Sequence, residues 1–119
     1  ENLAKCDQSL QMRFDLVSEL LQADEILIST PKWNWSIPSV LKAYVDQIIL
    51  IGILDPYSNK KLEGKRVTIV FATGGPHRPG LTDPSAYLKH VFSALGASDV
   101  EAIGTHYGLA GESLVDRKE

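Results

Sequence analysis

Residues 23–38, Ala-Asp-Glu-Ile-Leu-Ile-Ser-Thr-Pro-Lys-Trp-Asn-Trp-Ser-Ile-Pro, decide the fold that the sequence predicts. The continuous apolar run at 26–28 is typical of a short strand that is covered on both faces. Pro31 supplies no backbone donor to a sheet and therefore ends this strand. An aromatic loop and the start of a helix follow. This is the strand–loop–helix unit with which open α/β sheets build ligand sites outside the carboxyl ends of their strands.

Helical and strand patterns alternate on both sides of this stretch. Apolar residues at helical spacing predict a first helix over Ser9–Gln22, with Asp7 or Ser9 as its N-cap. The strand is expected over Glu25–Thr30. Ser36 is the expected N-cap of a second helix, since Pro38 is tolerated in a first turn.

The second half of the chain continues the alternation. We predict a strand over Val67–Ala72, a helix capped by Asp83 and closed by Gly96, and a shorter strand over Asp99–Thr105 near an edge of the sheet. Residues 112–119 are interpreted as the start of a final helix or a frayed tail. The pattern favours an α/β fold, a three-layer doubly wound parallel sheet with helices on both faces, within a single domain over residues 1–119.

Composition narrows the classes of function. The chain has 119 residues and a formal net charge of -3, which gives no electrostatic case for a nucleic-acid or anionic-membrane partner. Cys6 is the single cysteine, so we expect no disulfide framework and no metal site. No apolar run is long enough for a membrane span and no signal peptide is evident, so we expect a cytoplasmic protein. Motifs of serine hydrolases, zinc proteases, P-loop NTPases and dinucleotide-binding folds are absent.

Two unusual loops follow the first two strands, and parallel strands would bring both to one edge of the sheet. In the first loop, Trp33 and Trp35 offer flat surfaces on which a ligand could stack, and Asn34 offers a hydrogen-bond donor and an acceptor. The tryptophans could instead pack under the loop or seal a dimer contact. In the second, Gly74 and Gly75 would let backbone approach a planar ligand, although Gly-Gly is also a common turn. His77 could orient a ligand or be a solvated loop histidine.

A resemblance now adds to this pattern. Residues 23–38, followed by Leu41-Lys42-Ala43-Tyr44-Val45-Asp46, resemble the family of FMN-dependent NADH-azoreductases and NAD(P)H:quinone oxidoreductases, which has a flavodoxin-like fold. The stretch 72–83, Ala-Thr-Gly-Gly-Pro-His-Arg-Pro-Gly-Leu-Thr-Asp, resembles the second flavin loop of that family. The likeness extends from about Arg13 to Gly111. The family's first strand and its serine-rich phosphate-binding loop have no counterpart, so we expect an N-terminally incomplete sheet and the C-terminal part of a larger domain.

The resemblance implies a function. An FMN-dependent oxidoreductase would take hydride from NADH or NADPH and pass it through the flavin to a quinone or azo compound, with no catalytic side chain required. It also implies a homodimer, which would account for the apolar surplus at Ile49–Leu54; the pattern itself leaves deep burial or an interface open. The alternatives are an NAD(P)H:FMN reductase, or a flavin-binding or electron-transfer module without turnover. The residues that the resemblance places against the cofactor are Pro31, Lys32, Trp33, Asn34, Trp35, Ala72, Thr73, Gly74, Gly75 and His77.

Overall fold

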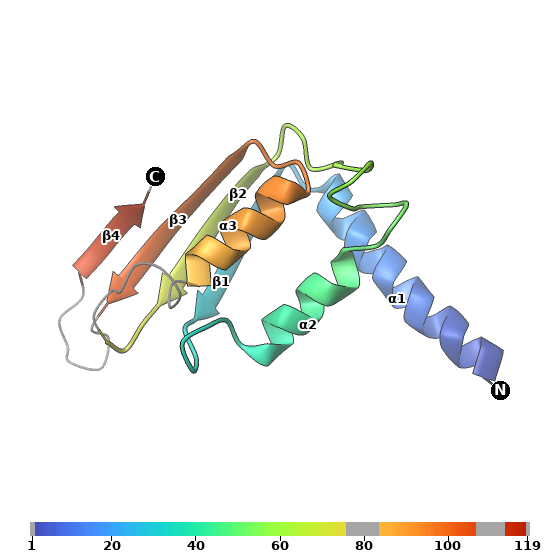
Figure 1. Cartoon of the computed structure of the whole chain (residues 1–119), viewed down its shortest axis with the longest axis horizontal. Coiled ribbons are helices and arrows are strands. Elements are labelled where there is room, and N and C mark those ends of the chain that lie inside the picture. The colour runs from blue at the N-terminus through green and yellow to red at the C-terminus, as the bar shows by residue number, and fades with distance from the viewer. Residues whose placement is uncertain (1, 76–83, 107–113, 119) are drawn as a thin grey trace.

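The fold is a four-stranded sheet with helices packed against it (Figure 1). This computed structural model describes residues 2–75, 84–106 and 114–118, with side chains over 7–75 and 84–105. The helices are α1 (Asn2–Gln22), α2 (Ser39–Ile48) and α3 (Pro84–Ala94), and the strands are β1 (Glu25–Pro31), β2 (Arg66–Ala72), β3 (Asp99–His106) and β4 (Leu114–Lys118). The strands lie in the order β1-β2-β3-β4.

The first three strands are parallel, as the alternating pattern predicted, and the fourth is antiparallel to β3. The register places Ile28 beside Ile69 and Ile69 beside Ala102. The strands therefore end together, and the loops that follow β1 and β2 leave the sheet at the same edge. This edge carries the candidate site.

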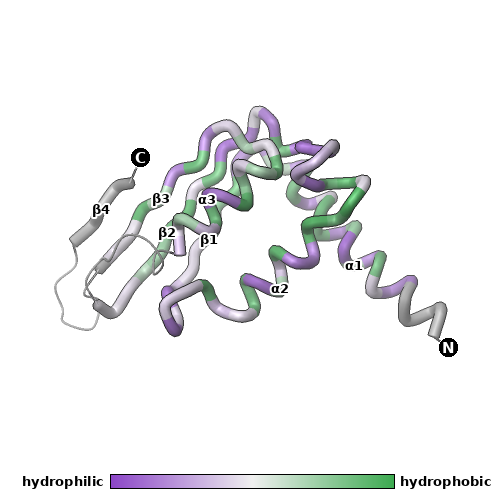
Figure 2. The backbone as a smooth tube through the Cα atoms, viewed as in Figure 1, coloured by the Kyte–Doolittle hydropathy of each residue, from purple (hydrophilic) through white to green (hydrophobic). Residues whose placement is uncertain are grey.

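One face of the sheet holds the core. Apolar side chains of β1, β2 and β3 pack there against α2 and α3, and Figure 2 shows hydrophobic residues in these strands and in the connection after α2. Ile48, Ile69, Leu88 and Phe92 are each fully buried within this cluster.

The opposite face of β1 is open among the described residues, so the prediction that this strand is covered on both faces is wrong there. Its burial alternates residue by residue, and Leu27 is 70% exposed. The Arg66 guanidinium lies on the same face between the carboxylates of Glu25 and Asp99, at 3.7 and 2.9 Å. The apolar run at 26–28 did not distinguish a half-covered strand from a fully covered one, because β-branched residues suit either.

Two basic side chains from elsewhere in the chain donate to the carbonyls at the carboxyl ends of α1 and α2. Arg13 of α1 donates to the backbone oxygens of Asp46, Gln47 and Ile49 at 3.3, 3.0 and 2.9 Å, where α2 ends. Lys65 donates to the oxygens of Leu21 and Ala23 at 2.9 and 2.6 Å, where α1 ends. Neither helix has a basic residue in its own last turn. Residues distant in the sequence thus satisfy the carbonyls that a helix C-terminus leaves free.

The connection between α2 and β2 is organised by a buried carboxylate. Asp55 is 1% exposed and accepts hydrogen bonds at 2.9 Å from the backbone N–H groups of Gly52, Tyr57 and Ser58 and from the Asn59 amide. The pKa of Asp55 is lowered well below its usual range, chiefly by the backbone hydrogen bond from Ser58. This polar stretch therefore folds as an ordered loop, with Leu54 and Leu62 buried on either side of it.

The end of α3 follows the prediction for Gly96. This glycine has a φ of +108°, the N–H of Ala97 donates to the oxygen of Phe92, and the N–H of Gly96 donates to that of Ser93. These two bonds form a Schellman motif, which requires a residue that adopts positive φ without strain.

Several predicted boundaries were wrong. The first helix begins at Asn2, so Asp7 and Ser9 lie inside it and cap nothing. Residues 114–118 form β4 in place of a final helix, which makes β3 an internal strand. Asp83, the expected cap of α3, lies outside the described residues. No helix in the described part of the chain combines the length and the apolar character that crossing a bilayer requires.

Candidate functional site

The two unusual loops meet at the carboxyl edge of the sheet, as predicted from the parallel order. Pro31 pairs with Ala72, and Ala72 pairs with Thr105 of β3. The pairing continues one residue further, because the N–H of Lys32 donates to the oxygen of Ala72 at 2.8 Å and that of Thr73 to Thr105 at 2.9 Å. The backbone of both loops is therefore fixed to the sheet where each loop begins.

The aromatic loop is a tight two-residue turn. Trp33 and Ser36 exchange backbone hydrogen bonds of 2.9 and 3.0 Å, while Asn34 and Trp35 between them have φ values of +49° and +64°. Positive φ at both central positions defines a type I′ turn, which asparagine tolerates and a bulky residue disfavours. Ser36 belongs to this turn, so the prediction that it caps α2 was wrong. Pro38 is the N-cap residue and makes no side-chain hydrogen bond.

Both tryptophans are directed to solvent. Trp33 is 59% and Trp35 is 72% exposed, which excludes the alternative that they pack under the loop. Holding a large ring outward on a left-handed residue costs stability, and such strain clusters at ligand sites. Exposure leaves two of the predicted roles for the tryptophans, a ligand surface and a dimer contact.

The strain can be measured by comparing Trp35→Gly with Trp35→Ala. Both variants remove the exposed ring, but alanine keeps the Cβ that makes left-handed backbone unfavourable. We expect the glycine variant to be more stable than the alanine variant by about 1 kcal/mol, as measured by urea unfolding. Equal stability of the two variants would show that residue 35 does not keep a positive φ in solution.

The second loop presents its backbone to the same edge. Ala72 is exposed, whereas Thr73 is 7% exposed and donates from its hydroxyl to the Gly75 oxygen at 3.0 Å. A Cβ built on Gly75 meets nothing within 4 Å in the part of the chain that the structure describes. The backbone here is therefore accessible to a ligand. His77, the remaining predicted site residue, lies outside the described residues.

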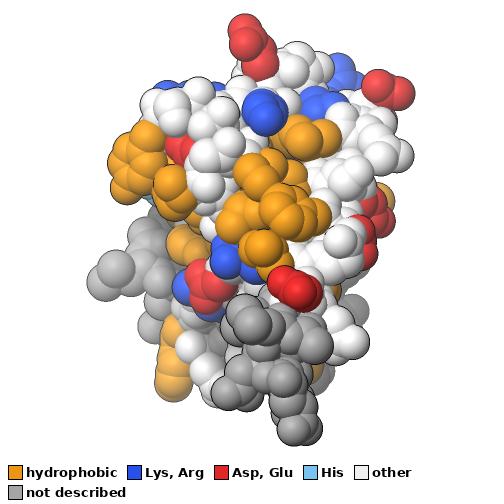
Figure 3. All heavy atoms as spheres, turned by 90° about the vertical axis from the view of Figure 1, so that its right-hand side faces the viewer, with side chains coloured by type: hydrophobic (Ala, Val, Ile, Leu, Met, Phe, Trp, Pro, Cys, Tyr) orange, Lys and Arg blue, Asp and Glu red, His pale blue; other side chains and the backbone are white. Residues whose placement is uncertain are grey.

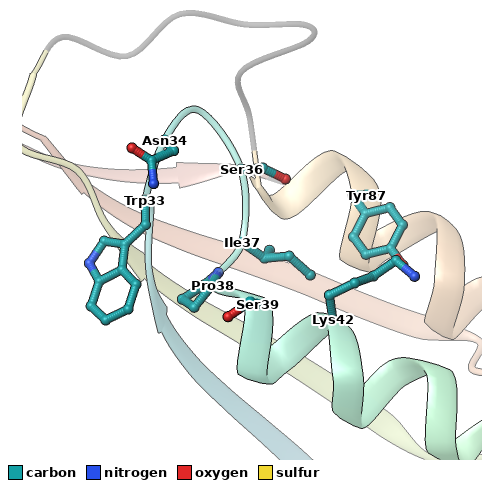
Figure 4. Close-up of a pocket in the computed structure, with 8 residues that line it drawn as sticks. All are labelled: Trp33, Asn34, Ser36, Ile37, Pro38, Ser39, Lys42 and Tyr87. Atoms are coloured by element: carbon teal, nitrogen blue, oxygen red, sulfur yellow. The ribbon is translucent and has the colours of Figure 1, made fainter.

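A pocket of about 470 Å³ adjoins the turn and extends between the N-terminal ends of α2 and α3 (Figure 4). Figure 4 shows the end of the Lys42 side chain beside Tyr87, with Ile37 to one side of both and the indole of Trp33 on the other side of the turn. The residues that line the pocket are Trp33, Asn34, Ser36, Ile37, Pro38, Ser39, Lys42 and Tyr87.

Lys42 and Tyr87 were not among the residues predicted for the site. The sequence nevertheless contained a positional signal for each of these two residues. Lys42 lies three residues after Ser39 and so shares its helix face, and Tyr87 lies in the first turns of a helix that begins at the site's edge. The pKa of Lys42 is raised, chiefly by its hydrogen bond to Asp46. The described residues contain no group of three His, Cys, Asp or Glu side chains placed to hold a metal ion.

Comparison with known proteins is consistent with this architecture. Residues 4–118 match a family model described as "Flavodoxin-like fold". Over 110 residues the chain is 37% identical to an FMN-dependent NADH:quinone oxidoreductase of Frankia alni, covering 87% of this chain and 52% of the relative. It is 39% identical over 103 residues to the enzyme of the same name from Frankia casuarinae, covering 81% and 49%. The chain thus spans about half the length of the curated relatives it matches.

A solved structure shares the fold. The FMN-dependent NADH-azoreductase of Bacillus anthracis, solved in complex with FMN, superposes with a TM-score of 0.71 at 22% identity, covering 82% of this chain and 51% of that one. The flavodoxin-like α/β fold expected from the resemblance is confirmed, with three parallel strands alternating with three helices in a chain shorter than its relatives.

Proposed function

The chain belongs to the flavodoxin-like family of FMN-dependent NADH:quinone oxidoreductases and azoreductases, and on that premise we propose that it binds FMN and reduces a quinone or azo compound at the expense of NADH or NADPH. The observation that carries the proposal is the meeting of two loops at the carboxyl edge of β1 and β2, where backbone and planar side chains are exposed together. Ligands of open α/β sheets bind at this edge.

The residues at this edge fit a flavin ring. Among the described residues, the space that a Cβ at Gly75 would take is open, and Ala72 at the end of β2 is exposed. On the first loop, Asn34 and Trp35 are exposed on a turn that the sheet anchors. A planar heterocycle needs a flat apolar wall and a few polar groups at its rim, and the two loops supply both.

We propose distinct roles for the two loops. Pro31, Lys32 and the aromatic turn flank one side of the ring, and the Asn34 amide donates to or accepts from its polar rim. Thr73, Gly74 and Gly75 contribute backbone groups from the other loop, with His77 following them. When bound, FMN supplies the acceptance of hydride and its onward delivery, so the protein needs to bind and orient the reactants and no side chain becomes covalently modified.

The visible absorption spectrum tests the proposal. The purified chain is mixed with FMN, freed of excess, and scanned for the flavin bands; NADH oxidation is then followed with and without a quinone. Retained flavin with quinone-dependent NADH oxidation supports the proposal. Retained flavin without turnover would instead indicate a flavin-binding or electron-transfer module. A colourless protein that cannot retain FMN would contradict the proposal for this chain.

We also propose that the chain forms a homodimer through the side bearing α1 and the connection after α2. Figure 3 views this side and shows hydrophobic side chains gathered near its middle. The segment at Ile49–Leu54 is divided: Leu54 is fully buried, whereas Ile51 is 70% exposed. The exposed apolar side chains that we assign to the interface are Leu10 and Phe14, which lie four residues apart on one face of α1, and Ile51.

Ile51→Asp tests this interface, because it places a charge where a dimer would exclude water. We expect sedimentation velocity to show a shift from dimer toward monomer. Val40→Asp is the matched control, since Val40 is 74% exposed but lies at the opposite end of α2. A wild-type chain that already sediments as a monomer, or a dimer unaffected by Ile51→Asp, would contradict the interface.

A further inference from the structure

The described residues of the two loops carry a single charged side chain. Residues 31–36 and 72–75 contribute proline, tryptophan, asparagine, serine, alanine, threonine and glycine, and Lys32 is the one ionised residue among them. Neither segment contains a carboxylate. The charge that these residues present at the carboxyl edge of the sheet is therefore positive.

Lys32 lies at the point where the two loops are joined. Its N–H donates to the oxygen of Ala72 at 2.8 Å, so the backbone of the first loop is bonded to the end of β2 at this residue. The next residue of the second loop, Thr73, is bonded in turn to Thr105 of β3 at 2.9 Å. The Lys32 backbone is thus held between the loops, and only the torsions of its side chain move the ammonium.

The Lys32 ammonium is available to a ligand. The residue is half-buried, and within the described part of the chain no hydrogen bond or ion pair engages its charged end. Lys42, by contrast, pairs with Asp46, and Lys65 donates to the carbonyls at the end of α1. An ammonium has three donors, and partial burial reduces the screening of its field by water.

The proposed reaction changes the charge beside this lysine. Hydride brings one proton and two electrons to a ring that is neutral when oxidised, so the reduced ring carries a negative charge near neutral pH. A cation at the rim of the ring stabilises this anion and has little effect on the neutral oxidised ring. The two oxidation states therefore differ in how strongly Lys32 would hold them.

We infer that Lys32 raises the redox potential of bound FMN, with its ammonium against the rim of the ring, where it stabilises the reduced form. The inference rests on the proposed function for the identity of the cofactor. A lysine that bound the phosphate of FMN would strengthen both oxidation states equally, because the charge of the phosphate does not change on reduction. The ratio of the affinities for reduced and oxidised FMN distinguishes these two positions.

The potential of bound FMN tests the inference without turnover. It is measured anaerobically by equilibration with a reference dye, and the affinity for oxidised FMN comes from fluorescence quenching. We expect Lys32→Met to weaken binding of reduced relative to oxidised FMN about tenfold, which lowers the potential of this two-electron couple by about 30 mV. The affinity for oxidised FMN should change by less than about twofold.

Sulfite provides an independent spectroscopic measurement. Its lone pair forms an N–S bond at N5 of the oxidised ring, and the displaced electron pair of the ring C=N bond leaves a negative charge on the ring. Bleaching of the visible flavin band reports this adduct in the absence of NADH and quinone. Lys32→Met should weaken sulfite binding about tenfold, because it removes the same stabilisation of ring charge.

Two further variants assign the effect to the charge at position 32. Lys32→Arg keeps a cation and should preserve both the potential and the sulfite affinity. Lys61→Met removes an exposed lysine from the connection before β2 and is the matched control, which should change neither value. Methionine suits the test at position 32 because its unbranched, flexible side chain replaces the lysine stem without its charge.

Contrary results overturn the inference in distinct ways. An unchanged potential in Lys32→Met would show that the ammonium does not act on the ring. Equal losses of affinity for oxidised and reduced FMN would place it at the phosphate, and a shift that Lys32→Arg also produces would exclude its charge as the cause. A wild-type chain that retains no FMN would contradict the proposed function and this inference together, whereas retained FMN with an unchanged potential would contradict the inference alone.

Discussion

Gly75→Val is expected to abolish retention of FMN while leaving the fold intact. A Cβ at position 75 meets nothing within 4 Å among the described residues, so valine's two methyl groups would extend into the space that the proposed function assigns to the flavin ring. Close approach of backbone to a ligand is what a glycine permits and valine prevents. We expect flavin affinity to fall by at least about tenfold, which is a loss of about 1.4 kcal/mol, as measured by fluorescence quenching of free FMN.

Gly52→Val provides the control for Gly75→Val. A Cβ at Gly52 also meets open space, but this residue has a φ of +86°, in the loop that Asp55 holds. Valine rarely adopts this positive φ, so its backbone would be strained even though its side chain has room. Gly52→Val should therefore lower the melting temperature and leave flavin retention unchanged. Gly75→Val should show the opposite pattern. Unchanged flavin affinity in Gly75→Val would mean that the cofactor does not contact this loop.

Much of the sheet could be predicted because its signals are local. The β-branched run of β2 and the apolar run of β1 located both strands to within a residue or two, and their parallel order placed the two loops at one edge. Gly96 could be assigned to the end of α3, because a helix that stops before a glycine commonly closes with positive φ.

The features that could not be predicted depend on contacts between distant residues. Neither the exposed face at Leu27 nor the capping of α2 by Arg13 leaves a periodic signal in the chain. The type I′ turn was missed because Asn34-Trp35 lacks the glycine that usually marks it. Lys42 was not proposed as a site residue because an exposed helical lysine is ordinarily a solvated one, and only the position of α3 places it in a pocket.

Gly104→Ala is expected to destabilise the core although it adds a single methyl group. Gly104 of β3 pairs with Phe71 of β2, and a Cβ at position 104 would lie 2.4 Å from the Phe71 ring. That ring is 1% exposed and packed within the core, so it cannot swing into solvent to make room. Overpacking of this kind costs about 1–3 kcal/mol, and we expect urea unfolding to show a loss in that range.

A double-mutant cycle isolates the contact between these two residues. Phe71→Leu shortens the opposing side chain and leaves a cavity, which destabilises the protein by itself. In that background Gly104→Ala should cost less than in the wild type, because the added methyl group then occupies space that the ring has vacated. Additive losses in the double variant would contradict the contact. They would mean that Gly104 is required for its backbone and not for the room it leaves to Phe71, since a glycine within a strand serves either purpose.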